Sequence, residues 1–298
     1  MRTRAFLLIS LAFLGGSRPA LAESAEEVTY FVPLVGVLSQ IIPGPQGPTY
    51  VYWTSSTGVF NNGPSPAMVH VKAAYGGGLW IASPPPCLNY QLRAGGGSSL
   101  GGCVFGPPGD GGNGFIEIDV EPSIVVTADI QRLLNVPNCV IGSIDGYGLI
   151  SQGSAPLPVY RGFFSAESTV VAGPVDLGSF DGPGTCITGP ATHRRRVNVT
   201  LFNGGTSEAT FTVTAIPLRA SSAPIYETHA DVPPRDVRQL NAIPIPVSSD
   251  LPYEFGYDIR VWLRITATQP FLAYVSTIFE GGEPGTNAVT VYEAKTSN

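Results

Sequence analysis

The chain has 298 residues, enough for one large domain or two ordinary ones. It is 43% hydrophobic, only 13% charged and carries a formal net charge of −6, which excludes general disorder and argues against a nucleic-acid partner, since such a partner needs a basic face. Its 36 glycines and 28 prolines follow no Gly-X-Y period, so collagen is excluded and an all-β protein with many turns is favoured.

The first 22 residues predict a signal peptide. Arg2 and Arg4 precede an apolar run at 5–14, and small residues at 20–22 provide a cleavage site after Ala22. The run is too short to span a bilayer, which takes about 20 residues, and no later segment is long and apolar enough. Cleavage would remove three arginines and no acid, so the charge becomes −9. We therefore expect an exported protein, periplasmic or extracellular, that is not membrane-spanning.

Two turns with nearly the same sequence lie 142 residues apart, FNNGPSPA at 60–67 and FNGGTSEA at 202–209. In the residues after each turn, apolar side chains occupy alternate positions, which is the period of a half-buried strand. The strand before the second turn, 197–202, alternates in the same way. Because Asn and Gly tolerate positive φ, each turn is predicted to close a hairpin.

Further similar segments follow in the same order, and together they predict a tandem duplication. They are DVEP at 119–122 with DVPP at 231–234, PLPVY at 156–160 with PFLAY at 270–274, and, more weakly, FVPLVGV from 31 with AGPVDLG from 172. We expect two domains, 23–164 and 165–298. The offset between copies falls from 142 to 112 in the stretch 73–119, which predicts about thirty extra residues in the first copy, a Gly-rich insertion at about 75–114.

Four cysteines in an exported chain predict two disulfides, for which three connectivities exist. Cys87 and Cys103 flank one glycine-rich loop, so we pair them locally. Cys139 is left with Cys186. The absence of a CxxC motif argues against a thiol-redox enzyme and a zinc ribbon.

Short strands separated by turn signals fill each copy. For the second copy they are predicted at 172–177, 197–202, 209–216, 237–240, 259–266, 271–278 and 288–292. The one stretch with any helical periodicity is 128–135, with a turn or two of helix at most. This count and spacing favour two tandem antiparallel β-sandwich domains of immunoglobulin-like (Ig-like) type, with a barrel as the alternative.

The segments RVNVTLFNGGTSEATFTVTAI and LRITATQPFLAYVSTIFE resemble the tandem immunoglobulin-like β-sandwich repeats of secreted and cell-surface bacterial proteins of unassigned function. In those repeats a strand ending in N-G-G or N-P-G precedes an Ala-Thr segment, and a later strand reads P-x-x-A-Y. The resemblance implies a fold and a place outside the cell. It implies no catalytic residues.

Motifs for catalysis or metal binding are missing from the sequence. His70, His193 and His229 form no HxH or HExxH pair, and there is no G-x-S-x-G or Walker motif, so no cofactor is expected. Asp110 and Asn113 are weak candidates for a metal site, because calcium needs six to eight oxygen ligands. The basic run at 193–196 is expected to be solvated or to protect an edge strand.

Exposed aromatic side chains are the better indication of function. Trp80 and Tyr90 lie on the predicted insertion and could stack on sugars or anchor a protein partner, whereas Trp53 and Trp262 are expected to fill or cover the core. We expect a non-enzymatic structural, adhesive or interaction protein with an unknown protein or glycan partner. The alternative is a carbohydrate-binding envelope protein that uses Trp80 and Tyr90, and a hydrolase is the least favoured class.

Overall fold

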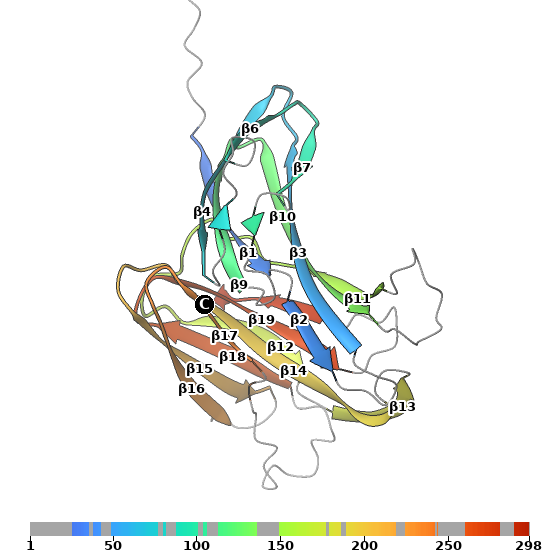
Figure 1. Ribbon diagram of the computed structural model, residues 1–298. Coiled ribbons are helices and arrows are strands. Elements are labelled where there is room, and N and C mark those ends of the chain that lie inside the picture. The colour runs from blue at the N-terminus through green and yellow to red at the C-terminus, as the bar shows by residue number, and fades with distance from the viewer. Residues whose placement is uncertain are drawn as a thin grey trace, which may run out of the picture.

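The computed structural model describes residues 26–35, 38–42, 49–76, 80–81, 88–100, 104–105, 113–135, 149–176, 179–185, 189–218, 224–241, 243, 260–280 and 289–297. These residues form strands joined by turns, and none of them is helical (Figure 1). The strands pair antiparallel in four sheets of four or five strands and one two-stranded ladder. The all-β prediction is confirmed. The turn of helix at 128–135 is wrong, because those residues belong to a long strand.

The first half of the chain contributes two sheets and the ladder. Sheet 1 has the order β1 (Val28–Val35), β9 (Asn113–Val120), β4 (Ala67–Tyr75), β6 (Asn89–Leu92). Sheet 2 has the order β11 (Leu149–Pro156), β10 (Ile124–Asn135), β3 (Thr49–Asn61), β2 (Leu38–Ile42), and β7 (Gly97–Ser99) also pairs with β3. The ladder joins β5 (Trp80–Ile81) to β8 (Val104–Phe105).

The second half contributes the other two sheets. Sheet 3 has the order β16 (Tyr226–Val232), β15 (Ala209–Pro217), β18 (Arg260–Ala267), β12 (Val170–Asp176), β21 (Lys295–Thr296). Sheet 4 has the order β13 (Ser179–Thr185), β14 (Gly189–Asn203), β19 (Phe271–Glu280), β20 (Val289–Glu293), and β17 (Val237–Leu240) pairs with β14. The seven strands predicted for this half are confirmed, while β13, β16 and β21 were not predicted.

Strand pairing in one half has a counterpart in the other. β4 pairs Ala67 with Leu92 of β6, and β15 pairs Ala209 with Val232 of β16. By the same rule β3 corresponds to β14 and β10 to β19, since Phe60 pairs with Val125 and Phe202 pairs with Leu272. Register therefore gives a residue-by-residue correspondence between the halves.

This correspondence corrects the alignment of the later landmarks. Leu92 corresponds to Val232, so DVPP matches 91–94 rather than DVEP, which ends strand β9. Likewise β9 corresponds to β18, because Val69 pairs with Val120 and Phe211 pairs with Ala267. By this register the stretch 67–120 corresponds to 209–267. The Gly-rich insertion at about 75–114 lies partly outside the described residues and stays a prediction.

The two similar turns are not hairpins, which corrects a second prediction. β3 lies in sheet 2 and β4 in sheet 1, so the turn at 61–67 carries the chain from one sheet to the other. The turn at 203–209 does the same between sheets 4 and 3. The Asn side chain serves here for hydrogen bonding within an arch, with the backbone amide of Gly as one donor to it. The short-range pattern does not distinguish this role from that of a hairpin turn.

An asparagine side chain holds each arch together. Asn203 donates through Nδ2 to the carbonyl oxygens of Ser207 (2.8 Å), Val232 (2.9 Å) and Pro233 (3.0 Å), and its Oδ1 accepts from the amide of Gly205 (2.8 Å). Asn61 makes the corresponding bonds, to Ser65 (2.8 Å), Leu92 (3.2 Å), Arg93 (3.3 Å) and from Gly63 (2.8 Å). Both asparagines are buried. Each therefore ties its own arch to the neighbouring connection after β16 or β6.

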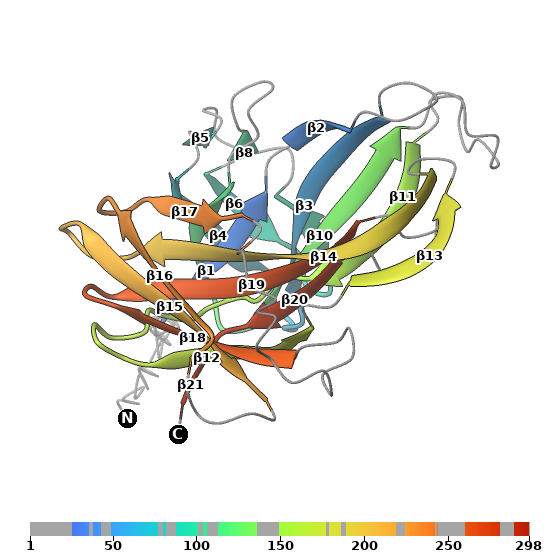
Figure 2. The same ribbon diagram turned by 90° about the horizontal axis from the view of Figure 1, so that it is seen from below.

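The central strands of sheet 4, β14 and β19, are buried on both faces over 197–203 and 271–278. Their residues Val199, Leu201 and Phe271 join side chains of sheet 3 in one core. On the opposite face, Phe202 and Leu272 join side chains of sheets 1 and 2 in the other core. Figure 1 accordingly places β14 and β19 between the first half and strands β15, β16 and β18, and Figure 2 shows β14, β19 and β20 side by side.

Replacing Asn203 by Ala is expected to lower the free energy of unfolding by about 2–3 kcal/mol, because two buried and two partly buried backbone groups lose their partner. Asn61→Ala is expected to cost less, since its contacts to Leu92 and Arg93 are longer. Urea denaturation measures both changes. The control is Asn62→Ala, whose side chain is exposed; a loss as large in the control as in Asn203→Ala would contradict the role assigned to the arch.

Candidate functional site

The junction between the halves is a cluster of aromatic rings. Phe202 of β14 stacks on Phe115 of β9, with ring centroids 4.8 Å apart and planes inclined by 16°. Tyr75 lies 5.4 Å from Phe202, and Phe163 of the connecting segment lies 5.7 Å from it. Phe163 in turn lies 4.4 Å from Phe31. Phe115 and Phe202 are fully buried, so the halves share a buried aromatic contact.

The segment between β11 and β12 is hydrogen-bonded to both halves. Tyr160 exchanges two backbone hydrogen bonds with Phe31 of β1, and Phe164 exchanges two with Phe271 of β19. The Tyr160 hydroxyl donates to the carbonyl oxygen of Ala273, 2.6 Å away. Burial raises the pKa of Tyr160 well above its ordinary value, so the group keeps the proton it donates. This segment is therefore a strap across the junction.

Arg235 covers one side of the aromatic cluster. Its guanidinium carbon lies 5.8 Å from the ring centre of Tyr75 and 5.6 Å from that of Phe163, within cation–π range. The backbone at Arg235 is left-handed, with φ of 57°. Gly204 is packed against the same ring of Phe163, because a Cβ atom there would lie 2.4 Å from it.

A cavity of about 320 Å³ lies beside the aromatic cluster. It is lined from both halves by apolar and polar side chains, namely Val35, Trp53, Asn113, Ile130, Arg196, Asn198, Gln239, Asn241, Tyr274, Ser276 and Ile278. The volume suits a ligand of the size of one sugar ring. Polar groups from β9, β14 and β19 thus face one space at the junction.

Three amides run along the wall of this cavity from one half to the other. Asn113 donates through Nδ2 to Oε1 of Gln239, and Gln239 donates through Nε2 to Oδ1 of Asn241, 2.6 Å away. Trp53 forms another part of the wall and is covered on a ring face by Arg132, whose guanidinium carbon lies 5.4 Å from the ring centre. Such amides can exchange hydrogen bonds with hydroxyl groups.

A second hollow lies on the outer face of sheet 3. This groove, of about 840 Å³, is lined by Thr169, Val171, Gly173, Ile216, Trp262, Arg264, Val291, Tyr292, Glu293, Lys295, Thr296 and Ser297. β12 is bulged against β18 between Ala172 and Val175, and Gly173 adopts φ of 128°, which favours glycine. The groove is open, and Trp262 and Tyr292 are each half-buried in it.

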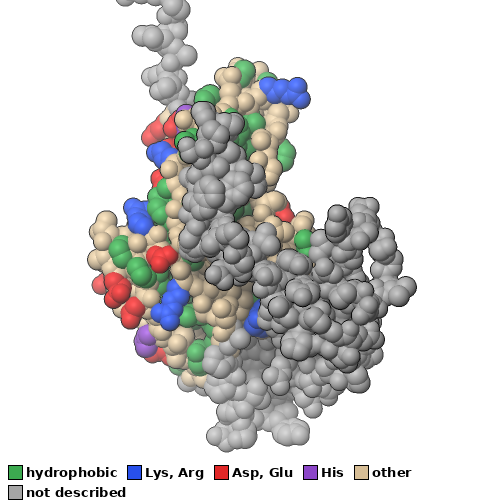
Figure 3. All heavy atoms as spheres, in the orientation of Figure 1, with side chains coloured by type: hydrophobic (Ala, Val, Ile, Leu, Met, Phe, Trp, Pro, Cys, Tyr) green, Lys and Arg blue, Asp and Glu red, His purple; other side chains and the backbone are tan. Residues whose placement is uncertain are grey.

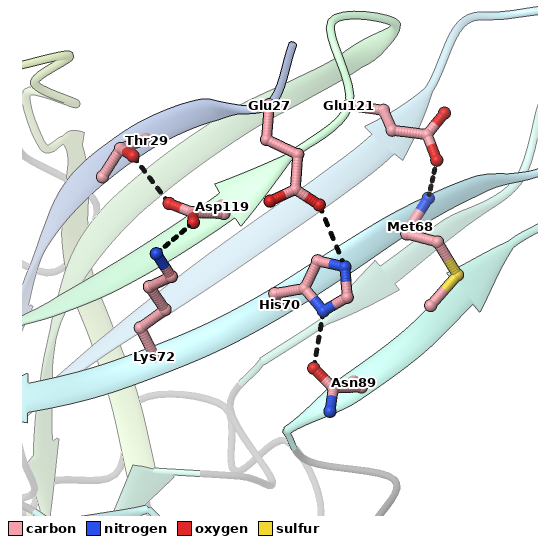
Figure 4. A network of polar contacts seen from close by, with 8 residues as sticks. All are labelled: Glu27, Thr29, Met68, His70, Lys72, Asn89, Asp119 and Glu121. Atoms are coloured by element: carbon pink, nitrogen blue, oxygen red, sulfur yellow. Dashed lines mark hydrogen bonds and ion pairs between the residues drawn. The ribbon is translucent and has the colours of Figure 1, made fainter. Parts of the chain in front are cut away.

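Polar side chains form a network on the outer face of sheet 1 (Figure 4). His70 of β4 contacts Oδ1 of Asn89 at 2.6 Å and Oε1 of Glu27 at 3.1 Å. On the same strand Lys72 lies 2.5 Å from Asp119, which also accepts from the Thr29 hydroxyl at 2.6 Å. The network ties β1, β9, β4 and β6 together across the sheet.

Asp119 is nearly buried within this network. Burial acts to raise its pKa, but hydrogen bonds from Lys72 and Thr29 and the charge of Lys72 outweigh burial, so the pKa lies below its ordinary value. The same contact raises the pKa of Lys72. Over the face seen in Figure 3, basic and acidic side chains of the described residues are interspersed.

The residues singled out in the sequence lie in different places. The backbone of Trp80 pairs with Phe105 in the ladder, while its side chain, Asp110 and the cysteines Cys87, Cys103, Cys139 and Cys186 lie outside the described residues. Tyr90 packs against the first core; burial raises the pKa of its hydroxyl to about 12, and no hydrogen-bond partner for it lies among the described residues. Asn113 faces the junction cavity and is bonded to Gln239.

The junction residues were missed in the sequence. The repeated turn does indicate one junction residue. It aligns Phe60 with Phe202 and so identifies an aromatic residue on the outer face of one sheet in each half. Two adjacent aromatic residues, Phe163 and Phe164, in a segment between strands were a second signal.

Comparisons with known proteins identify no family. No family model and no curated protein matches the chain. Among solved structures, the C-terminal domain of the Streptococcus pyogenes antigen I/II-family protein AspA aligns at 7% identity over 90% of this chain and 99% of its own, with a TM-score of 0.17. An anti-sigma factor domain-containing protein aligns at 8% identity over 91% and 96%, with a TM-score of 0.12. Structural similarity at these TM-scores does not establish a shared fold.

The described part of the chain offers neither a metal-binding cluster nor a membrane-spanning helix. It contains no group of three or more His, Cys, Asp or Glu side chains that could hold a metal ion. It also contains no helix of the length and apolarity needed to cross a bilayer.

Gly204→Ala is expected to loosen the junction, because the new methyl group would overlap the Phe163 ring and displace it from Phe31 and Phe202. The expected loss is about 1–3 kcal/mol in the free energy of unfolding. Scanning calorimetry tests this change, with Gly162→Ala as the control, since a Cβ there meets nothing within 4 Å. Equal melting temperatures for the two variants would contradict tight packing at Gly204.

Asp119→Asn is expected to destabilise the protein at about pH 7 and to have much less effect near pH 3. The folded-state pKa of Asp119 is depressed, so its contribution is present above the unfolded pKa and is lost as pH falls through the folded value. Urea denaturation of both proteins across this range measures the difference. Asp231→Asn, which removes an exposed carboxylate bonded to Thr210, serves as the control. A difference independent of pH would argue against the ionised carboxylate as the cause.

Proposed function

We propose that the chain is an exported, non-enzymatic structural or adhesive protein that acts by interaction. It would consist of two Ig-like β-sandwich domains, 23–164 and 165–298, that arose by internal duplication. The matching registers of the two halves support the duplication, and the joint contribution of two sheets to each core supports the sandwich. The protein would act in the periplasm or outside the cell.

The observation that carries this proposal is the buried stacking of Phe202 on Phe115. Domains in one chain move relative to one another unless their interface is large and apolar. Here rings from both halves, the strap at Tyr160 and the cation–π contacts of Arg235 fix one arrangement. A pair of domains held in this way can bear load and present its outer loops at a constant separation, as a structural or adhesive module must.

Carbohydrate binding is the second candidate, and the junction cavity favours it. Amide side chains and a tryptophan around a space of about 320 Å³ suit the hydroxyl groups and the apolar face of a sugar ring. Trp80 and Tyr90 remain a predicted second contact for a glycan. A hydrolase remains the least favoured class.

Deleting the gene from the cells that encode the protein tests the proposal. We expect lower surface attachment or cell–cell aggregation, restored by the intact chain and by Gly162→Ala. The junction variant Gly204→Ala is expected to restore less, because its two halves are no longer held in one arrangement.

Three results would count against the proposal. Unchanged attachment and aggregation in the deletion strain would contradict a structural or adhesive role. Specific binding on a glycan array that is lost on replacing Asn241 or Trp80 by Ala would favour the second candidate instead. Turnover of any glycoside, ester or peptide in a broad substrate panel would overturn both.

A further inference from the structure

Two large apolar side chains are exposed together on the outer face of sheet 2. Phe60 of β3 is 48% exposed and Val125 of β10 is 44% exposed, and the register pairs them directly. The Phe60 ring lies over Gly97 of β7, where a Cβ atom would come within 2.6 Å of it. We call Phe60 and Val125 the exposed pair.

In the second half the same two positions are fully buried. Phe202 corresponds to Phe60 and Leu272 to Val125, because β14 pairs with β19 as β3 pairs with β10. Neither Phe202 nor Leu272 is accessible to solvent, since both belong to the core completed by the first half. The position of the exposed pair is therefore one that this fold uses for docking.

The surface that receives Phe202 also has a counterpart. Tyr75 and Phe115 pair across β4 and β9, and Phe31 lies beside them on β1. In sheet 3 the corresponding pair is Ile216 and Trp262. Val171 corresponds to Phe31, because Phe31 pairs with Glu117 and Val171 pairs with Arg264, the counterpart of Glu117.

Val171, Ile216 and Trp262 all line the open groove on the outer face of sheet 3. The groove thus occupies the place that Phe202 fills in the first half. Each chain thus makes this contact once, at the junction. It also carries both surfaces of an equivalent contact, the exposed pair and the groove, and these do not meet within the chain.

We propose that a second copy of the chain docks its exposed pair, Phe60 and Val125, into the groove lined by Val171, Ile216 and Trp262. This proposal deepens the proposed structural role by naming the partner. Because the two surfaces differ, the contact is heterologous. Each added copy therefore leaves one exposed pair and one groove free for the next copy. In Figure 1 the end of β3 near β7 lies at the top, whereas β12, β15 and β18 lie in the lower half, as head-to-tail assembly requires.

Residues of opposite charge occupy equivalent positions on the two surfaces. In the junction Asn113 and Ser276, from opposite halves, line the same cavity. Their counterparts by register are Arg260, at the start of β18, and Asp129 of β10. Docking would bring this arginine of one copy toward this aspartate of the next.

The contact between chains is weaker than the junction within the chain. Arg235 corresponds to Gly95, and both adopt left-handed backbone, with φ of 57° and 66°, but Gly95 brings no guanidinium to the rings. The strap at Tyr160 also holds the two halves of one chain at a high effective concentration, and no such link joins two separate chains. We therefore expect reversible association that grows with protein concentration.

Sedimentation velocity on residues 23–298 over a range of concentrations tests the proposal. The intact chain is expected to form dimers and longer species without stopping at a dimer. Phe60→Ser and Trp262→Ser are each expected to weaken association by about tenfold or more, because each removes an aromatic anchor. Met68→Ser, on the outer face of the other sheet of the first half, is the control and is expected to associate as the intact chain does. Circular dichroism and thermal melting verify that each variant is folded.

Mixing the two variants gives the sharper result. Phe60→Ser keeps an intact groove and Trp262→Ser keeps an intact exposed pair, so their equimolar mixture is expected to form a 1:1 dimer that grows no further. An intact chain that remains monomeric at about 1 mM, a closed dimer unaffected by either variant, or a mixture that associates no better than its components would overturn the proposal. None of these outcomes bears on the deletion phenotype, so the structural role can stand or fall separately.

Discussion

The contact of sheet 4 with both cores is the constraint on which the rest of the molecule depends. Phe202 and Leu272 face the first half, while Leu201 and Phe271, their immediate neighbours in sequence, face the second. One sheet therefore closes two apolar interiors. Because apolar surface removed from water is the main stabilising contribution in folding, the loss of this sheet would expose both cores together.

Alternation along the strands could be read from the sequence, but the environment of each face could not. The pattern at 209–216 predicted a strand with one buried face, and β15 buries Phe211 and Val213 as expected. The same pattern at 197–202 predicted a polar face open to solvent, whereas Asn198 and Thr200 are buried under the first half. A period of two identifies which residues share a face, but not what later covers that face.

A repeated sequence segment identified equivalent positions where its side chains make equivalent bonds, and it was misleading where they do not. The asparagines at 61 and 203 make equivalent bonds, so the similarity of the two turns reflects a shared structural requirement. DVEP and DVPP look as similar but lie on strands that do not correspond, because Asp and Pro are common at strand ends for local reasons. The junction cavity could not be predicted at all, since its lining comes from β1, β3, β9, β10, β14 and β19 and the segment around β17.

Sheet 4 contributes differently to the two cores, and this difference bears on the order in which the chain folds. The second core draws on sheets 3 and 4, which are encoded after the first half, and on the strap residue Phe164, which packs against it. The first core gains Phe202 and Leu272 only once β14 and β19 have been made. The first half is thus expected to build most of its core from its own sheets and to bury its junction face only when the second half has been made.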